Sequence, residues 1–228
     1  MSGRVAVLVP AAGSGARMGG LAKAFMILRG EPLLVHALRP FLARTDVRHA
    51  VVALPADHAA APPPWLAELD PRVTIVAGGE RRAESVRCAL AALPDEVEIV
   101  IVHDAARPLI TAAIVERTLA ATGPRVGAIA AIPAIDTIQH VDADRRIVST
   151  PEREALWQAQ TPQAFPRALL AAAYERAARD GFVPTDEASL VVRYGGTVVV
   201  VEGARENMKI TVPSDLLCAD AVLGARGP

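Results

Sequence analysis

Residues 4–25 read RVAVLVPAAGSGARMGGLAKAF, an apolar run followed directly by a glycine-rich turn. The run is short, continuous and rich in valine, which is typical of a strand buried on both faces of a sheet. Glycines at a strand-to-helix turn let backbone N–H groups approach a phosphate closely. The stretch therefore predicts the first strand of an α/β domain, with an anion-binding turn at its carboxyl end.

The alternation of apolar runs and amphipathic stretches continues along the chain. Further strands are predicted at 47–55, 72–78, 96–104, 126–134 and 197–203, and helices at 32–44, 82–93, 111–122, 166–181, 185–196 and 213–224. Continuous Val, Ile and Ala runs favour parallel strands covered by helices on both faces. We therefore predict an α/β fold with a doubly wound, mostly parallel sheet.

One segment breaks this rhythm. The stretch DTIQHVDADRRIVST (136–150) contains two β-like pieces around the turn DADR, with little apolar content to bury. We predict that 134–156 is a projecting hairpin arm that reaches a partner, within a chain whose residues 1–228 otherwise form a single domain.

The overall composition is that of an ordinary globular protein. The chain has 228 residues, 52% of them hydrophobic, and a formal net charge of −1, which argues against binding to nucleic acid or to an anionic membrane. Cys88 and Cys218 do not form a Cys-x-x-Cys pair, and the first apolar run is too short for a signal peptide or a membrane span. We expect a cytoplasmic protein.

The glycine turn fails the two commonest nucleotide-binding patterns. After Gly15 and Gly20 a Walker A loop would require lysine, but Leu21 follows, and the dinucleotide fingerprint that starts at Gly13 meets Met18 at its sixth position. The first apolar strand after this turn also ends in ALP, without the acidic residue of an NAD site. A third possible function, that of an NAD-dependent oxidoreductase, is therefore disfavoured.

Lysine is rare in this chain. Of 24 basic residues only two, Lys23 and Lys209, are lysines. Lysine is preferred to arginine where a compact point charge must approach a phosphate end-on. The two lysines are therefore candidate phosphate ligands.

Seven motifs in order resemble one known family. They are AAGSGARM (11–18), GGERRAESV (78–86), VHDAARP (102–108), DTI (136–138), WQAQTPQAF (157–165), TDEAS (185–189) and VEGARENMKIT (201–211). Together they resemble the 2-C-methyl-D-erythritol 4-phosphate cytidylyltransferases, nucleotidyltransferases of the non-mevalonate isoprenoid route. The resemblance implies a Rossmann-like nucleotidyltransferase fold, transfer of CMP from CTP to the acceptor phosphate with release of pyrophosphate, and a homodimer.

The resemblance also assigns residues. It implies catalysis by Arg17, Lys23 and Lys209, which stabilise charge on the phosphates. It implies nucleotide binding by the following residues of the first two motifs: Ala11, Ala12, Gly13, Gly15, Gly79, Glu80 and Ser85. It implies acceptor binding by Arg107, Thr137, Arg153, Thr161 and Thr185, with Arg153 reaching the active site of the other subunit.

The predicted metal ligand is Asp104, at the carboxyl end of the fourth predicted strand. A lone carboxylate at this edge suits Mg²⁺, which completes its shell with phosphate oxygens and water. His103 next to it alternates to the other side of the strand, and we predict a structural role for it. Thr185 has a second predicted role as the N-cap of the helix that follows it.

The chain departs from the family pattern at two points. Lys23 stands in LAKAF, about one residue closer to Arg17 than is usual in the family, and Glu80 replaces an aspartate that is common there. Two other functions stay open. One is cytidylyl transfer to D-ribitol 5-phosphate by the same chemistry, and the other is nucleotide binding without turnover.

Overall fold

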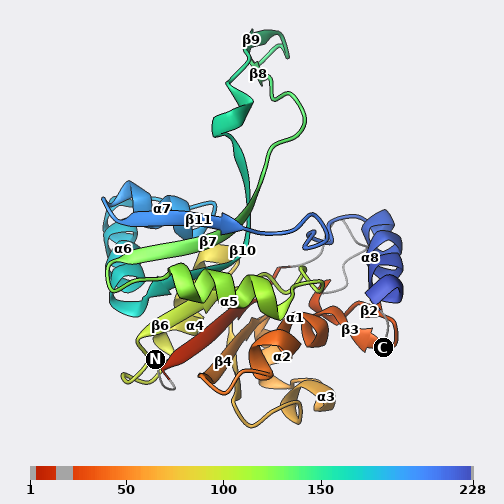
Figure 1. The fold of residues 1–228 in the computed structure, drawn as a ribbon. Coiled ribbons are helices and arrows are strands. Elements are labelled where there is room, and N and C mark those ends of the chain that lie inside the picture. Colours follow the sequence, from red (N-terminus) through yellow and green to blue (C-terminus); the bar gives the residue numbers. More distant parts are fainter. Residues whose placement is uncertain (1–3, 14–22, 227–228) are drawn as a thin grey trace.

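The computed structural model describes residues 4–13 and 23–226. Its main sheet has seven strands, and helices cover both faces of that sheet (Figure 1). The strand order is β11-β7-β10-β6-β1-β4-β5. All neighbours run parallel except β10, which is antiparallel to both β6 and β7. The strands are β1 (Val5–Pro10), β4 (Val47–Leu54), β5 (Val73–Ala77), β6 (Ile99–Val102), β7 (Val126–Pro133), β10 (Trp157–Pro166) and β11 (Thr197–Glu202). The predicted mostly parallel, doubly wound α/β fold is confirmed.

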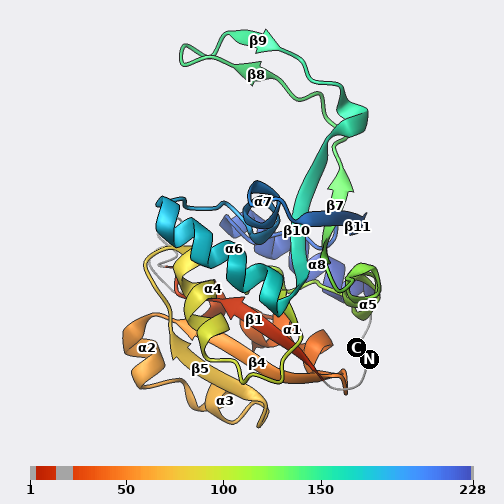
Figure 2. The ribbon, with the colours of Figure 1, turned by 90° about the vertical axis from the view of Figure 1, so that its left-hand side faces the viewer.

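The central strand β1 is buried on both sides, as its unbroken apolar run predicts. Val7 and Val9 contribute to the core on one face, and Ala6 and Leu8 to the core on the other. Helices α1 (Leu33–Leu42) and α5 (Ala112–Ala121) cover the first face. Helices α4 (Arg82–Ala91), α6 (Arg167–Asp180) and α7 (Glu187–Arg193) cover the second (Figure 2).

A third, smaller apolar cluster lies beside the sheet. It packs Leu28, Leu109 and Ile210 against Ala219 of α8 (Pro213–Arg226). The two-stranded ribbon of β2 (Ile27–Leu28) and β3 (Glu31–Pro32) belongs to this region, and the sequence pattern did not predict it. Through Ile210, the cluster anchors the segment before α8, and this segment carries Lys209.

Strand β10 was not among the predicted strands. Its sequence WQAQTPQAFP contains three glutamines and an internal proline, so it shows no apolar run. It is nevertheless buried from Gln160 to Phe165, and its register against β7 shifts between Ala159 and Gln163. The shift releases the residues around Pro162 from regular pairing with β7, which accommodates a residue without an N–H.

Several element boundaries also differ from the prediction. The helix predicted to start at Thr185 starts at Glu187, and its N-cap is Asp186, whose Oδ1 accepts the Ser189 N–H at 2.8 Å. The prediction of Thr185 as N-cap is therefore wrong, because the neighbouring carboxylate takes that role. Two short helices, α2 (Ala56–Ala60) and α3 (Pro64–Ala67), lie in the proline-rich segment between β4 and β5.

The arm extends from the neighbouring strands β7 and β10. The hairpin of β8 (His140–Val141) and β9 (Ile147–Ser149) lies beyond the body of the molecule, on the extended ends of β7 and β10 (Figures 1 and 2). Its exposed side chains include Ile138, Ile147 and Val148.

No helix in the described part of the chain has both the length and the apolar character needed to cross a membrane.

Candidate active site

A cavity of about 520 Å³ opens at the carboxyl ends of the parallel strands β1, β5 and β6. Open α/β sheets bind ligands at this edge, because the loops that follow the strands diverge there. Most of the predicted catalytic, nucleotide-binding and metal residues line it, namely Ala11, Ala12, Gly13, Lys23, Gly79, Glu80, Ser85, Asp104 and Lys209. The predicted residues Gly15 and Arg17 lie outside the described part of the chain.

The cavity wall at Gly79 and Ser85, with Gly78 directly before it, depends on small residues. A Cβ at Gly78 would lie 2.6 Å from the Cβ of Ala12 and 2.7 Å from the Oγ of Ser85. Glycine therefore lets the turn after β5 approach the turn after β1 closely. The Ser85 hydroxyl donates to the carbonyls of Gly79 and Arg81, each at 3.3 Å, which ties the start of α4 to this wall.

A second cavity of about 160 Å³ adjoins the first. Thr161 and Thr185, two of the predicted acceptor contacts, line it together with Arg107. Three charged side chains line both cavities: Arg82, Asp104 and Lys209. These three side chains therefore form the boundary between the two spaces.

Asp104 lies at the centre of that boundary. Its Oδ2 accepts from the Lys209 Nζ at 2.7 Å and its Oδ1 from the Arg82 Nε at 2.9 Å, while the Arg107 Nε lies 3.9 Å from Oδ2. Burial alone would raise the pKa of Asp104, but the charges of Arg82 and Lys209 outweigh burial and hold it well below its ordinary value. Asp104 is therefore ionised.

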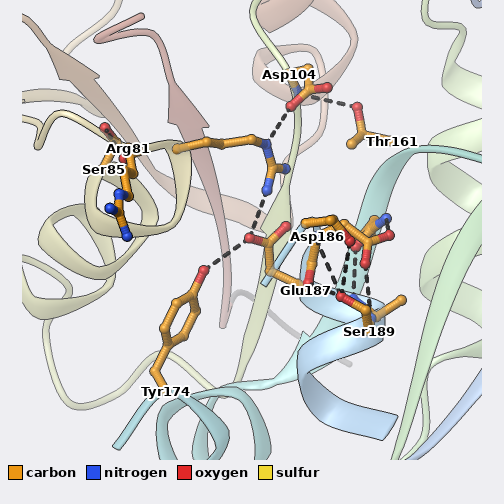
Figure 3. Close-up of polar contacts among 12 residues, drawn as sticks. Arg81, Ser85, Asp104, Thr161, Tyr174, Asp186, Glu187 and Ser189 are labelled. Atoms are coloured by element: carbon orange, nitrogen blue, oxygen red, sulfur yellow. Dashed lines mark hydrogen bonds and ion pairs between the residues drawn. The ribbon is translucent and has the colours of Figure 1, made fainter. Parts of the chain in front are cut away.

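The Arg82 guanidinium connects Asp104 to a buried carboxylate on α7. Its Nη1 donates to the Oε1 of Glu187 at 2.8 Å, and the Tyr174 hydroxyl of α6 donates to the same oxygen at 2.9 Å. Figure 3 shows Asp104 and Thr161 at one end of this chain of contacts and Tyr174 at the other. Burial disfavours the Arg82 charge, but the charges of Glu187 and Asp104 hold the pKa of Arg82 above its ordinary value.

His103 has the structural role predicted for it. Its Nε2 lies 3.2 Å from the carbonyl of Arg107, which can only accept, so Nε2 carries the proton and Nδ1 accepts from the Thr161 hydroxyl at 3.0 Å. The Thr161 oxygen in turn accepts the Asp104 N–H at 3.0 Å. Burial lowers the pKa of His103 to about 4, so the imidazole is neutral and joins β10 to the Asp104 turn.

The segment that carries Lys209 is fixed by buried amides. The Asn207 Nδ2 donates to the Gln160 Oε1 at 3.1 Å and to the Thr161 carbonyl at 2.9 Å. The Asn207 carbonyl accepts from the Arg107 Nη1 at 2.7 Å. Strand β10 thus holds the segment before Lys209 through the Gln160 side chain and the Thr161 carbonyl, which gives a glutamine in this buried strand a structural role.

Lys23 also lines the larger cavity, in a 3₁₀ turn (Lys23–Phe25). Its Nζ donates to the Thr211 carbonyl at 3.4 Å. Thr211 follows Lys209 by two residues, so the loop that carries Lys209 also contacts Lys23.

Two predicted acceptor contacts are not brought to this site. Thr137 and Arg153 lie on the arm and line neither cavity. The Arg153 Nη1 donates to the carbonyl of Ile135, at the base of the arm.

The carboxylates present fit a cation that a nucleotide brings with it. Within residues 4–13 and 23–226, no three acidic, histidine or cysteine side chains are grouped so that they could hold a metal ion. Asp104 and Glu80 are the carboxylates that line the larger cavity. One or two carboxylates suit Mg²⁺ when phosphates supply its other ligands.

The sequence reasoning missed part of this site. Arg82, Glu187, Tyr174, Gln160 and Asn207 were not predicted as site residues, although all but Tyr174 stand inside the quoted motifs. Arg81 and Arg82 are adjacent in the sequence and both line the larger cavity, and only the start of α4 decides that Arg82 also lines the smaller one. Tyr174 carried no signal, because it stands in an ordinary amphipathic helix.

Comparisons with known proteins agree with this geometry. A model of the 2-C-methyl-D-erythritol 4-phosphate cytidylyltransferase family matches residues 5–225. The protein of that name from Symbiobacterium thermophilum is 44% identical over 96% of this chain and 92% of its own. The crystal structure of the Thermus thermophilus cytidylyltransferase of that name is 33% identical, with a TM-score of 0.78 over 98% of this chain and 100% of its own. A 4-diphosphocytidyl-2C-methyl-D-erythritol synthase from Anaerococcus prevotii is 27% identical, with a TM-score of 0.85 over 97% of this chain and 99% of its own.

Proposed function

This chain belongs to the 2-C-methyl-D-erythritol 4-phosphate cytidylyltransferase family, and we propose that it transfers CMP from CTP to 2-C-methyl-D-erythritol 4-phosphate. The products are 4-diphosphocytidyl-2-C-methyl-D-erythritol and pyrophosphate. The observation that carries this proposal is the shared boundary of the two cavities. Arg82, Asp104 and Lys209 form that boundary, which supports a site with a nucleotide in one cavity and an acceptor phosphate in the other.

The larger cavity has the features that CTP requires. The small residues of the β1 and β5 turns let backbone groups reach the cytosine edge, and Lys23 lines the same cavity as a cation for the triphosphate. The smaller cavity, which Thr161 also lines, offers the hydroxyl of Thr185 and the guanidinium of Arg107, which suit a phosphorylated polyol.

The reaction needs charge neutralisation and alignment rather than a protein nucleophile. An acceptor phosphate oxygen attacks the α-phosphorus of CTP, the bond from that phosphorus to the bridging oxygen breaks, and pyrophosphate leaves. Lys209 and Arg82 act where the two reactants meet, and Lys23 acts on the triphosphate from within the larger cavity. Preorganised donors of this kind typically contribute about 10²–10³ in rate each.

Asp104 is the residue that would hold Mg²⁺ when the nucleotide carries it in. The ion would supply charge neutralisation on the phosphates. Before it binds, Asp104 holds Lys209 and Arg82 in place at the boundary.

A homodimer and a cytoplasmic location are parts of the same proposal. The arm exposes Ile147 and Val148, at 65% and 61% of their surface, and a second copy of the chain would cover them. It also carries Thr137 and Arg153, which line neither cavity of their own chain. Cys88 and Cys218 are both free thiols, which suits a reducing compartment.

The test is release of pyrophosphate from CTP and Mg²⁺ with either 2-C-methyl-D-erythritol 4-phosphate or D-ribitol 5-phosphate. We expect release with the first acceptor and none above background with the second. Release with ribitol phosphate alone would keep the chemistry but change the acceptor. No release with either acceptor would contradict the enzyme assignment and favour nucleotide binding without turnover.

A further inference from the structure

The carboxylate of Glu187 is unusually placed for a residue with no direct access to the cavities. It is completely buried, and it lines neither the larger nor the smaller cavity. Its Oε1 accepts from Arg82 and Tyr174, while its Oε2 has no hydrogen-bond partner among the described residues. Burying a charge with one oxygen unsatisfied costs free energy, and apolar residues of similar size often serve stability as well or better. Stability alone therefore does not explain this carboxylate.

What Glu187 does is restrict Arg82. A planar guanidinium that donates Nε to Asp104 and Nη1 to Glu187 cannot rotate, because the two acceptors lie on different elements, after β6 and at the start of α7. Tyr174 restricts Glu187 in turn, from α6. The remaining Nη2 edge of Arg82 has no acceptor among the described residues, and Arg82 lines both cavities.

We propose that Glu187 is a positioning residue, which fixes the Arg82 guanidinium so that its Nη2 edge holds the acceptor's phosphate during transfer. The inference rests on the proposed function. Glu187 also lies next to the residues proposed to bind the acceptor, because Thr185 and Asp186, immediately before it, line the smaller cavity. The turn that contacts the acceptor is thus the turn that orients Arg82.

The test compares Glu187→Gln with the wild type, using kcat and KM for each substrate. Glutamine keeps the shape and an acceptor for Tyr174 but loses the charge that holds Arg82. We expect kcat/KM for the acceptor to fall by roughly 10–100-fold, while KM for CTP stays within about twofold. Tyr174→Phe, which leaves the Glu187–Arg82 contact in place, should cost less than about tenfold.

A double-mutant cycle separates positioning from a general loss of structure. If Glu187 acts through Arg82, then adding Glu187→Gln to an Arg82→Met enzyme should reduce kcat/KM by less than about threefold further. Asp70→Asn, which breaks an ion pair at the other end of β5, is the control. It should lower stability with kcat and both KM values unchanged. If Arg82→Met does not fold, Arg82→Lys takes its place in the cycle.

Two results would overturn the inference while the wild type remains active with methylerythritol phosphate. One is a Glu187→Gln enzyme whose kcat/KM is within twofold of the wild type. The other is a loss that multiplies fully with that of the Arg82 variant. A wild-type enzyme that is inactive with both acceptors would instead overturn the proposed function, and the inference with it.

Discussion

The loop before α8 carries Lys209 and also accepts a hydrogen bond from Lys23. Lys209 donates to the Asp104 carboxylate at 2.7 Å, and Lys23 donates to the Thr211 carbonyl at 3.4 Å. Both lysines line the larger cavity, which we propose binds the triphosphate.

The first residue-scale prediction concerns the Lys23 side chain. Replacing Lys23 by alanine should lower kcat by about 10²–10³, because one donor to the charge developing on the phosphates is lost. The stability of the fold should change little, since Lys23 lines a cavity and is only partly buried. Steady-state pyrophosphate release and a thermal melt of the same sample measure the two effects.

Lys23→Arg is the matched control for that prediction. It keeps the positive charge but replaces the compact ammonium with a planar fork, so we expect it to recover part of the lost rate. A Lys23→Ala enzyme with more than a tenth of the wild-type kcat would show that Lys23 does not act on the phosphates.

For single residues, the sequence motifs predicted those whose residue type alone indicates their chemical role. Asp104 and Lys209 were predicted, and the structure pairs them. Arg82 and Glu187 were not, because their importance lies in their contact with each other. Those two residues are 105 positions apart, and no local pattern encodes their approach.

At the scale of elements, apolar periodicity predicted the parallel strands and the main helices well. It failed for β10, whose burial depends on hydrogen bonds rather than on apolar side chains. Gln163 donates from Nε2 to Asp186 and accepts the Ala188 N–H on its Oε1, which satisfies it inside the protein. A polar strand of this kind cannot be recognised until its partners are known, and these partners lie on α7 and in the Lys209 loop.

A single arginine joins several elements at the amino end of β5, away from the cavities. Arg72 precedes β5, and it donates to the carbonyls of Leu42, Arg44 and Val47 and to both oxygens of Asp70. Its contacts join the end of α1, the start of β4 and the start of β5. The charge-assisted bonds lower the pKa of Asp70 to about 2.

This pair gives a prediction of pH dependence. The pKa of Asp70 is lower in the folded state than its ordinary 3.8, so the pair stabilises the fold above pH 4, and that contribution is lost as the pH falls towards 2. Asp70→Asn should therefore lower the free energy of unfolding by about 1–2 kcal/mol at pH 7, allowing for partial solvent screening. Urea unfolding of both proteins between pH 7 and pH 2 measures the difference.

The difference between the two proteins should shrink across the acid range. Below pH 4 the wild type loses the same interaction that the variant already lacks, so the two unfolding free energies should converge. A difference that stays constant from pH 7 to pH 2 would mean that the Asp70 charge contributes nothing beyond its hydrogen bonds.

At the scale of the whole molecule, the arm is the feature that one chain alone does not explain. It exposes Ile135, Ile138, Val141, Ile147 and Val148 to solvent and contributes nothing to either cavity of its own chain. Thr137 and Arg153 lie on it, far along the chain from Lys209. If the arm of one subunit completes the site of the other, each active site contains residues from two chains.

That arrangement predicts complementation between two inactive variants. Arg153→Ala damages only the arm's contribution, and Lys209→Ala damages only the body's. In a mixed dimer, one site combines the intact body of the first variant with the intact arm of the second. Random pairing of equal amounts makes half of the dimers mixed, with one working site in each, so the mixture should recover about one quarter of the wild-type activity.

The mixture must be prepared by co-expression or joint refolding, so that the subunits exchange, and sedimentation then confirms the dimer. The control combines Lys23→Ala with Lys209→Ala. Both of those changes lie in the body, so no mixed dimer has an intact site, and the mixture should stay as inactive as its components. If the Arg153→Ala and Lys209→Ala mixture is equally inactive while sedimenting as a dimer, the arm serves its own chain or none. The exposed apolar side chains would then explain dimerisation alone.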